Sequence, residues 1–549
     1  MRRSSPGWLA AIGLGLWAST PSPVVAQAGT WALTNARIQT VTQGVIDKGT
    51  LIIRNGLIEA VGANLPIPPD ARVLDLAGRT ISPGMIDLAS TIASGPAAPA
   101  AGAGAGGAAA AAAANPSGRP AGYDPAWAVA DELRPSAADL KAAREAGITA
   151  VLLSAQRGGI RGQSALVPTR DSLERADVIR APVAMHFGFQ GAQGTYPATL
   201  LGVIAYERQT LYDAQRYGLV ADRYRTNPRG LERPAFDPGL EALVPVVRGT
   251  LPTFFAASNE NEIRRAAKIA AEFPLKLTVV GATEGWRAVD ALKGRAAVVS
   301  VNFPGPTEST GWAYRLARKD GPDSTRADSA TKVAIERNAA LLHRAGIPMA
   351  LGTGGLRPAE FLPNVRKAVA AGLPAEVALQ ALTIRAAELA GMGAALGSIE
   401  TGKIANLVVT DKGDLLADSA RVREVFVDGI RYEVAAPPSA RAAAGGGAPA
   451  QVAGAWAMTL QSPQGPMELT LTFQQSGASL AGSMASMMGN TAIDEGQVNG
   501  QAVAWTTTIQ MGGQSITLNF QGQVEGTRMK GNATLGTFGS ATFTAEKKP

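Results

Sequence analysis

Few side chains in this sequence could take part in metal or nucleophilic chemistry. The 549 residues include only two histidines, His186 and His343, and no cysteine. Thiolate metal sites and cysteine nucleophiles are therefore excluded, and two histidines on unrelated segments do not make a metal centre. His186 in "APVAMHFGF" could be a ligand or a proton shuttle, although we favour a hydrogen-bonded histidine near the core. His343 lies in the middle of an expected helix.

Two carboxylates, Asp87 and Glu284, stand near the ends of expected strands and could hold a hard metal ion or handle protons. We favour a structural role for Asp87. Glu284 follows Thr283 at an expected helix start, where the helix dipole stabilises an acidic side chain. No residue is assigned to catalysis, and Asp87, Glu284 and His186 are kept as the candidates.

The Gly-rich segment "GGIRGQSALV" contains Ser164, but it lacks the Gly-x-Ser-x-Gly pattern of a nucleophilic serine and has no histidine nearby. Glycines there let the backbone turn closely over the rim of a pocket. We therefore name Gln163 and Ser164, together with Ser90, as candidates for lining a ligand pocket.

The elements that must position these residues follow two patterns. Short apolar runs around an Asn55-Gly56 turn predict a small β module before the main domain. From Ser136 onward, helix and strand patterns alternate. "SAADLKAAREAGITAVLLS", for example, begins at a capping serine, stops at Gly147 and enters an apolar strand. Alternation of this kind predicts a parallel α/β sheet, either a (β/α)₈ barrel or an open doubly wound sheet.

The C-terminal region has a different period. Apolar residues alternate in "MELTLTF" and in "QSITLNFQGQV", which predicts an antiparallel all-β domain, a small barrel or a sandwich, over residues 451–549. A Pro/Ala/Gly-rich linker, residues 436–450, precedes it. A low-complexity Ala/Gly/Pro loop is expected at 93–122.

The N-terminal residues have the features of an export signal. Arg2 and Arg3 precede an apolar run and an Ala-Gln-Ala ending, which predicts a cleavable signal peptide over residues 1–28 and a periplasmic or extracellular protein. The apolar run is too short for a membrane span, and no membrane span is expected elsewhere. Basic residues are scattered singly despite the net charge of +7, so nucleic-acid binding is not expected.

Three separated segments resemble the amidohydrolase superfamily, specifically its imidazolonepropionase-like branch: "LTNARIQTVTQGVIDKGTLIIRNGLIEAVG", "LDLAGRTISPGMID" and "LQALTIRAAELAGMGAALGSIETGKIANLVVTD". The resemblance covers residues 31–435 and leaves the C-terminal domain unrecognised. It implies a (β/α)₈ TIM barrel over residues 81–397 and a β-sandwich module formed by the flanking residues 29–80 and 398–435. It also implies hydrolysis of C–N bonds by one or two divalent metals such as Zn²⁺.

The metal-ligand positions that the resemblance implies carry no ligand side chains. The family's His-x-His pair falls at Ala89 and Thr91, two later histidines fall at Ala256 and Gly281, and an aspartate falls at Gly354. We therefore expect no metal cofactor.

The leading hypothesis is an exported pseudoenzyme whose barrel binds a small amide or dipeptide-like ligand, or an active homologous subunit. Two alternatives stay open. The chain could hydrolyse C–N bonds with carboxylate ligands or residues donated by a partner subunit, or the C-terminal β domain could be a binding or adhesion module.

Overall fold

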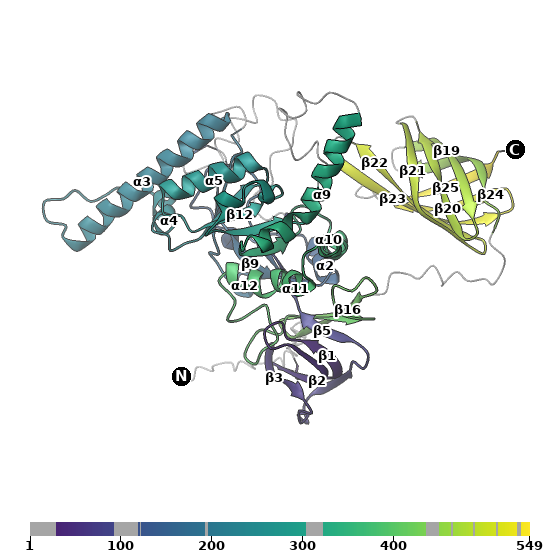
Figure 1. Cartoon of the computed structure of the whole chain (residues 1–549), viewed down its shortest axis with the longest axis horizontal. Helices are drawn as coiled ribbons and strands as arrows, with labels where there is room; N and C mark the ends of the chain where they lie inside the picture. Colours follow the sequence, from purple (N-terminus) through teal and green to yellow (C-terminus); the bar gives the residue numbers. More distant parts are fainter. Residues whose placement is uncertain are drawn as a thin grey trace, which may run out of the picture. The chain divides into compact units, whose positions relative to one another are not determined.

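The computed structural model describes residues 29–92, 119–120, 122–192, 196–303, 322–434, 450–462, 465–486, 489–511, 514–534 and 540–548. The chain divides into two compact units, Met1–Val434 and Ala435–Pro549 (Figure 1). The expected signal peptide, nearly all of the low-complexity loop and all but the last residue of the expected linker lie outside the described residues. Within the described ranges, no helix is long and apolar enough to cross a membrane.

Strands from both ends of the first unit form one β module. Its sheet has the order β17-β16-β15-β5-β1-β2-β3, with β4 beside β1. The strands are β1 (Trp31–Gln39), β2 (Val45–Arg54), β3 (Leu57–Ala63), β4 (Arg72–Asp75), β5 (Thr80–Pro83), β15 (Leu407–Asp411), β16 (Arg421–Val427) and β17 (Ile430–Glu433). The antiparallel pairing of β5 with β15 joins sequence that precedes the barrel to sequence that follows it.

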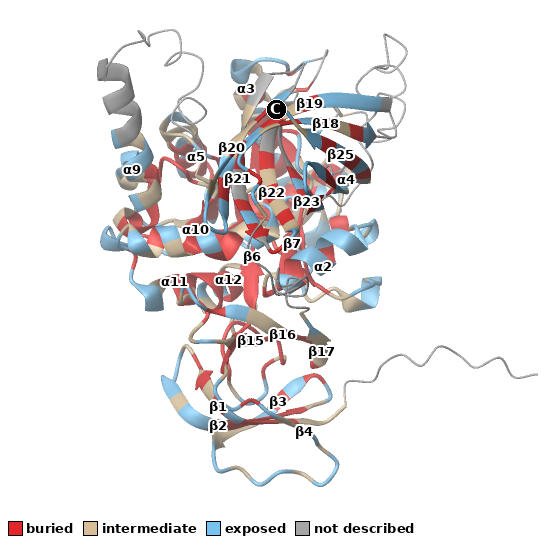
Figure 2. Ribbon diagram, turned by 90° about the vertical axis from the view of Figure 1, so that its right-hand side faces the viewer, coloured by how far each residue is buried: buried red, intermediate tan, exposed pale blue. Residues whose placement is uncertain are grey.

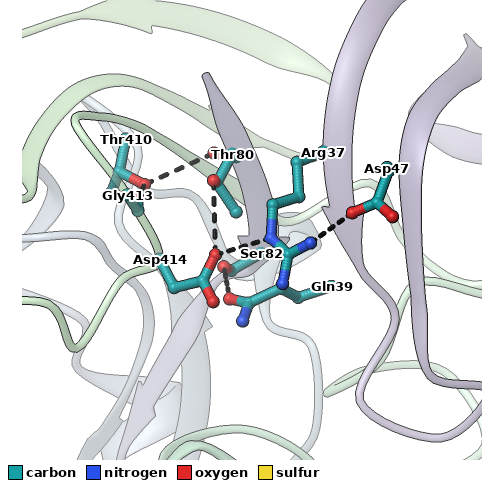
Figure 3. A network of polar contacts seen from close by, with 8 residues as sticks. All are labelled: Arg37, Gln39, Asp47, Thr80, Ser82, Thr410, Gly413 and Asp414. Carbon is teal, nitrogen blue, oxygen red and sulfur yellow. Dashed lines mark hydrogen bonds and ion pairs between the residues drawn. The ribbon is translucent and has the colours of Figure 1, made fainter. Parts of the chain in front are cut away.

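Polar side chains also link the two halves of this module (Figure 3). The Arg37 Nε donates to the Asp414 carboxylate over 3.0 Å, and Arg37 also pairs with Asp47. The Thr80 hydroxyl donates to the same Asp414 oxygen over 3.4 Å. Because the Arg37 and Asp414 side chains are 41% and 39% exposed, this ion pair contributes little, and the backbone ladder carries the attachment.

The barrel is built from two sheets, with orders β14-β13-β12-β11-β10-β8 and β6-β7-β9. Its strands are β6 (Met85–Asp87), β7 (Ile148–Leu153), β8 (Ile160–Gln163), β9 (Ala165–Pro168), β10 (Met185–Gly188), β11 (Thr253–Ala257), β12 (Leu277–Gly281), β13 (Ala296–Ser300) and β14 (Met349–Gly352). The two sheets meet between β14 and β6, where the Gly354 N–H donates to the Ala89 carbonyl over 3.2 Å. The predicted TIM-barrel class is confirmed.

The third strand position of the barrel, formed by β8 and β9 together, runs antiparallel to its neighbours. β8 pairs antiparallel with β10, and β9, which is separated from β8 by one residue, pairs antiparallel with β7. The remaining pairs, β6 with β7 and β10 through β14, are parallel. Residues 160–168 therefore form the third strand of the barrel in the inverted direction. As a result, the start of β8 lies level with the carboxyl end of β10.

The described helices connect and cover these strands. They are α2 (Ala137–Glu145), α3 (Leu200–Thr226), α4 (Pro238–Val247), α5 (Glu260–Glu272), α6 (Val289–Leu292), α9 (Pro322–Arg344), α10 (Pro358–Ala370), α11 (Ala375–Leu382) and α12 (Ile384–Leu389), with short 3₁₀ turns η1 (Val129–Asp131), η2 (Arg175–Asp177) and η3 (Gly285–Arg287). Helix α2 begins where predicted, because the Ser136 side chain accepts from the Asp139 N–H.

The core of the first unit lies between the strands and these helices. Every residue of β7 is buried, as expected for a strand covered on both faces. Figure 2 shows α2 and α10 with one face buried and the other exposed. In α10 the buried positions include Phe361 and Val365, spaced four residues apart on one helix face.

The second unit is a closed barrel of eight strands. Its strands are β18 (Gly454–Ser462), β19 (Gly465–Ser476), β20 (Ser479–Ser486), β21 (Gly489–Asn499), β22 (Ala502–Met511), β23 (Gln514–Glu525), β24 (Arg528–Thr534) and β25 (Ser540–Lys547). Closure by β18 against β25 selects the barrel over the sandwich among the predicted all-β forms. An aromatic cluster fills it, in which Trp505 stacks on Phe520 at 4.9 Å and meets the edge of Phe543 at 5.5 Å.

Candidate functional site

A pocket of about 500 Å³ opens at the carboxyl ends of the parallel strands. All five positions at which the family resemblance places metal ligands line this pocket, although they come from four separate strand ends: Ala89, Thr91, Ala256, Gly281 and Gly354. In a TIM barrel this end builds the active site. The structure thus brings the expected positions together, and the pocket is the candidate functional site.

The residues around the pocket do not fit a divalent metal ion. Among the described residues, no group of three or more His, Cys, Asp or Glu side chains could hold one. His186 and Glu262 line the pocket. The Glu262 carboxylate is already engaged, since it accepts from the Ser258 N–H over 2.9 Å and closes the capping box of α5. One free imidazole is not a metal centre.

The backbone at two of the five positions also disfavours a ligand side chain. Gly281 has φ +104° and Gly354 has φ +57°, in the left-handed region that costs other residues about 1–2 kcal/mol. A Cβ at Gly281 would lie 2.7 Å from the Ser258 Oγ, and one at Gly354 would overlap the Ser300 side chain. Neighbouring side chains therefore occupy the space that a ligand would need.

Asp87 lies beneath the pocket and serves barrel closure. Its side chain accepts from the Ala89 N–H and the Thr353 N–H, each over 3.0 Å, and from the Thr353 hydroxyl over 2.6 Å. Burial raises the pKa of this carboxyl, although these hydrogen bonds oppose the rise. Since Asp87 is 2% exposed and does not line the pocket, it is not placed to act on a ligand there.

Glu284 is also turned away from the pocket. One carboxylate oxygen accepts from the Glu260 N–H over 3.0 Å, at the first residue of α5. The sequence predicted that Glu284 would stabilise a helix start. The structure instead places it at the 3₁₀ turn η3, and the helix that it contacts is the preceding α5. Its other oxygen is buried without a hydrogen-bond partner in the described structure.

His186 lines the pocket from β10. Its ring lies 5.5 Å from that of Phe254, and its Nε2 is buried with no hydrogen-bond partner among the described residues. Burial, and then the charge of Arg161, lower the pKa of His186 to about 3, so the imidazole is neutral at physiological pH. The favoured sequence interpretation placed His186 as a hydrogen-bonded histidine near the core, and this buried Nε2 has no such hydrogen bond among the described residues.

The three residues predicted to line a ligand pocket lie in different places in the structure. Ser90 lines the pocket, but Gln163 lines a different cavity of about 820 Å³, because β8 runs away from the mouth and ends near the amino end of β10. Ser164 is 1% exposed, and its hydroxyl donates to the Ala184 carbonyl over 3.3 Å, so it lines neither cavity. Gln163 thus lines a pocket as predicted, although not the one at the barrel mouth, and the inverted direction of residues 160–168 is the physical reason for both placements.

Sequence reasoning missed Arg161, which lines the same pocket. Burial lowers the pKa of its guanidinium, and Glu207 opposes that shift. A lone arginine between glycines in "GGIRGQ" was the available signal, but only the direction of β8 shows that this residue reaches the mouth.

Comparisons with known proteins agree with this architecture. Residues 253–431 match the amidohydrolase family, whereas no curated protein matches the chain. An amidohydrolase from Thermotoga maritima MSB8 is similar in structure, with 23% identity, a TM-score of 0.58, and coverage of 73% of this chain and 99% of that chain. A Xaa-Pro dipeptidase with bound methionine in its active site has 17% identity and a TM-score of 0.44, over 74% and 100%.

The resemblance read from the sequence is thereby confirmed at the level of the superfamily. The family match covers strands β11 to β14, which carry three of the five ligand positions, and the barrel and β module complete the architecture. Residues 253–431 thus match the amidohydrolase family, and the first unit has the same fold as the amidohydrolase from Thermotoga maritima MSB8.

Proposed function

We propose that this chain is a ligand-binding protein built on a hydrolase fold and that it has lost metal-dependent hydrolysis. The observation that carries the proposal is the lining of the barrel mouth, where none of the five family positions has a metal-binding side chain. The positive-φ glycines at 281 and 354 support it further, because a side chain there would be strained and would approach the neighbouring serines too closely.

The pocket remains suited to a small molecule. A volume of about 500 Å³ lies within the usual range for ligand sites. Apolar walls such as Leu88 and Val280 alternate with amide and hydroxyl groups, among them Asn302. Such a lining suits a small amide or dipeptide-like compound, which offers both apolar and hydrogen-bonding surface.

We further propose that the mature protein is exported after removal of residues 1–28. The basic residues, apolar run and Ala-Gln-Ala ending support this proposal. Amino-terminal sequencing of the protein recovered from the producing cell's exterior or periplasm should begin at Gly29. Recovery of an intact Met1 terminus in the cytoplasm would contradict it.

Metal loading and ligand binding together test the main proposal. The mature protein is dialysed against trace Zn²⁺, Mn²⁺ and Fe²⁺, and the bound metal is measured by elemental analysis. We expect well below one equivalent per chain, no hydrolysis of dipeptides, and a rise in melting temperature with at least one member of a panel of small amides, dipeptides and N-acyl amino acids.

One or two equivalents of metal, with hydrolysis of the same compounds, would show that the ligands lie elsewhere and would overturn the proposal. Residues donated by a partner subunit, and binding by the C-terminal barrel, stay predictions from the sequence. The first predicts activity only after mixing with a second protein, and the second predicts binding by residues 450–549 alone.

A further inference from the structure

Arg161 reaches the barrel mouth through an irregularity in its strand. Gly162 pairs with His186 and Ile160 pairs with Phe187, so two steps along β8 match one step along β10. Arg161 is the extra residue of this β-bulge. Bulges turn a side chain out of its normal direction and are frequent next to functional sites. Here the turned side chain lines the pocket.

The surrounding residues make room for the guanidinium and leave most of its donors free. Arg161 Nε donates to the Gly158 carbonyl over 2.9 Å. A Cβ at Gly188 would overlap the Arg161 guanidinium where it now lies, so the glycine leaves room for this position of the side chain. Among the described residues, Arg161 forms no ion pair within 4.0 Å, and no hydrogen bond from its Nη atoms is found.

The charges near Arg161 do not neutralise it. Glu262, the acidic residue that lines the pocket, is occupied by the backbone at the start of α5. Glu207 on α3 is near enough to interact electrostatically, but it is fully buried, and neither of its oxygens has a hydrogen-bond partner in the described chain. Burial raises the pKa of Glu207 well above its usual value, which favours the uncharged acid.

We infer that the barrel mouth binds a small organic anion whose carboxylate faces the Arg161 guanidinium. Free Nη donors in a partly desolvated site match the two oxygens of a carboxylate. This inference rests on the proposed binding function and names the class of ligand.

Matched acids and amides test the inference on the unmodified full chain. The probes are N-acetyl amino acids, each compared with its C-terminal amide, which keeps the shape and removes the charge. Isothermal titration calorimetry measures the dissociation constants. We expect the acid to bind at least about tenfold more tightly than its amide, because a charge-assisted hydrogen bond is lost with the carboxylate.

Three variants locate the effect. Arg161→Gln should reduce the affinity for the acid to that for the amide, and Arg161→Lys should keep part of the difference because lysine retains the charge without the planar fork. Arg157→Gln removes an exposed arginine of the same loop that does not line the pocket, and should leave both affinities unchanged. If Arg161→Gln does not fold, the acid–amide comparison on the unmodified chain decides alone.

Each failure has a separate meaning. If amides bind as tightly as the acids, or if Arg161→Gln folds and still distinguishes them, the anion inference is overturned while the proposed binding function stands. If neither acids nor amides bind at millimolar concentration, the proposed function fails together with the inference.

Discussion

Replacing His186 with glutamine should make the first unit less sensitive to acid. His186 is 7% exposed, and its pKa falls from 6.5 to about 3 in the folded chain, first through burial and second through the charge of Arg161. The unfolded chain therefore binds a proton below about pH 6.5 that the folded chain does not bind until about pH 3. Stability that is present above pH 6.5 is lost as the pH falls through this window.

The size of the effect follows from these two pKa values. At about pH 5.5, roughly one unit below the unfolded value, proton linkage lowers the free energy of unfolding by about 1.4 kcal/mol relative to about pH 7.5. The folded value lies so far below pH 5.5 that the unfolded value sets this magnitude. His186→Gln removes the group, so the change with pH should be about 1.4 kcal/mol smaller in the variant.

Urea unfolding followed by circular dichroism at the helical wavelength measures the difference. The described α-helices all belong to the first unit, so this signal reports on it and not on the strands of the second. His343→Gln, at an exposed position of α9, controls for the loss of any one histidine. Equal loss of stability in the unmodified chain and in His186→Gln between the two pH values would refute the reasoning.

Three further substitutions have expected outcomes in the same unfolding experiment. Asp87→Ala should destabilise the first unit by about 2–4 kcal/mol, because the Thr353 hydroxyl and two backbone N–H groups lose their acceptor, and a change below about 1 kcal/mol would contradict its role in barrel closure. Gly281→Ala should cost about 1–2 kcal/mol at φ +104°, and an unchanged midpoint would show that the backbone relaxes there. Phe543→Ala should destabilise the second unit by about 3–5 kcal/mol, seen in the part of the tryptophan fluorescence change that comes from Trp456 and Trp505, with no shift in the helical transition, and a coincident helical shift would show that the two units unfold together.

Elements with local signals were predictable from the sequence. Ser136 and Gly147 bound a helix because a capping hydroxyl and a left-handed glycine act within one turn, and α2 ends at Glu145, two residues before Gly147. The Asn55-Gly56 turn lies between β2 and β3 for the same reason, since both residues have positive φ. The positions around the pocket followed from the family resemblance.

The inverted direction of the third barrel strand, residues 160–168, was not predictable in this way. Residues 160–168 carry an apolar pattern that fits a strand of either direction, and pairing with β7 and β10 decides between them only in the folded chain. That direction places Arg161 at the mouth and Gln163 at the other end. The bulge that turns Arg161 depends equally on its partner strand, so residue type and spacing alone could not identify this side chain as part of the site.

The close approach of Gly354 to Ser300 has a consequence for anyone who mutates this barrel. Gly354→Asp alone meets both a left-handed backbone and the Ser300 side chain. Replacing Ser300 first would leave the Asn302 N–H without the hydroxyl that it contacts over 3.1 Å. We therefore expect positions 300 and 354 to be epistatic, since the cost of Gly354→Asp depends on the side chain at position 300. Saturation mutagenesis at single sites would miss the compatible pairs, and a library that varies both positions together would reach them.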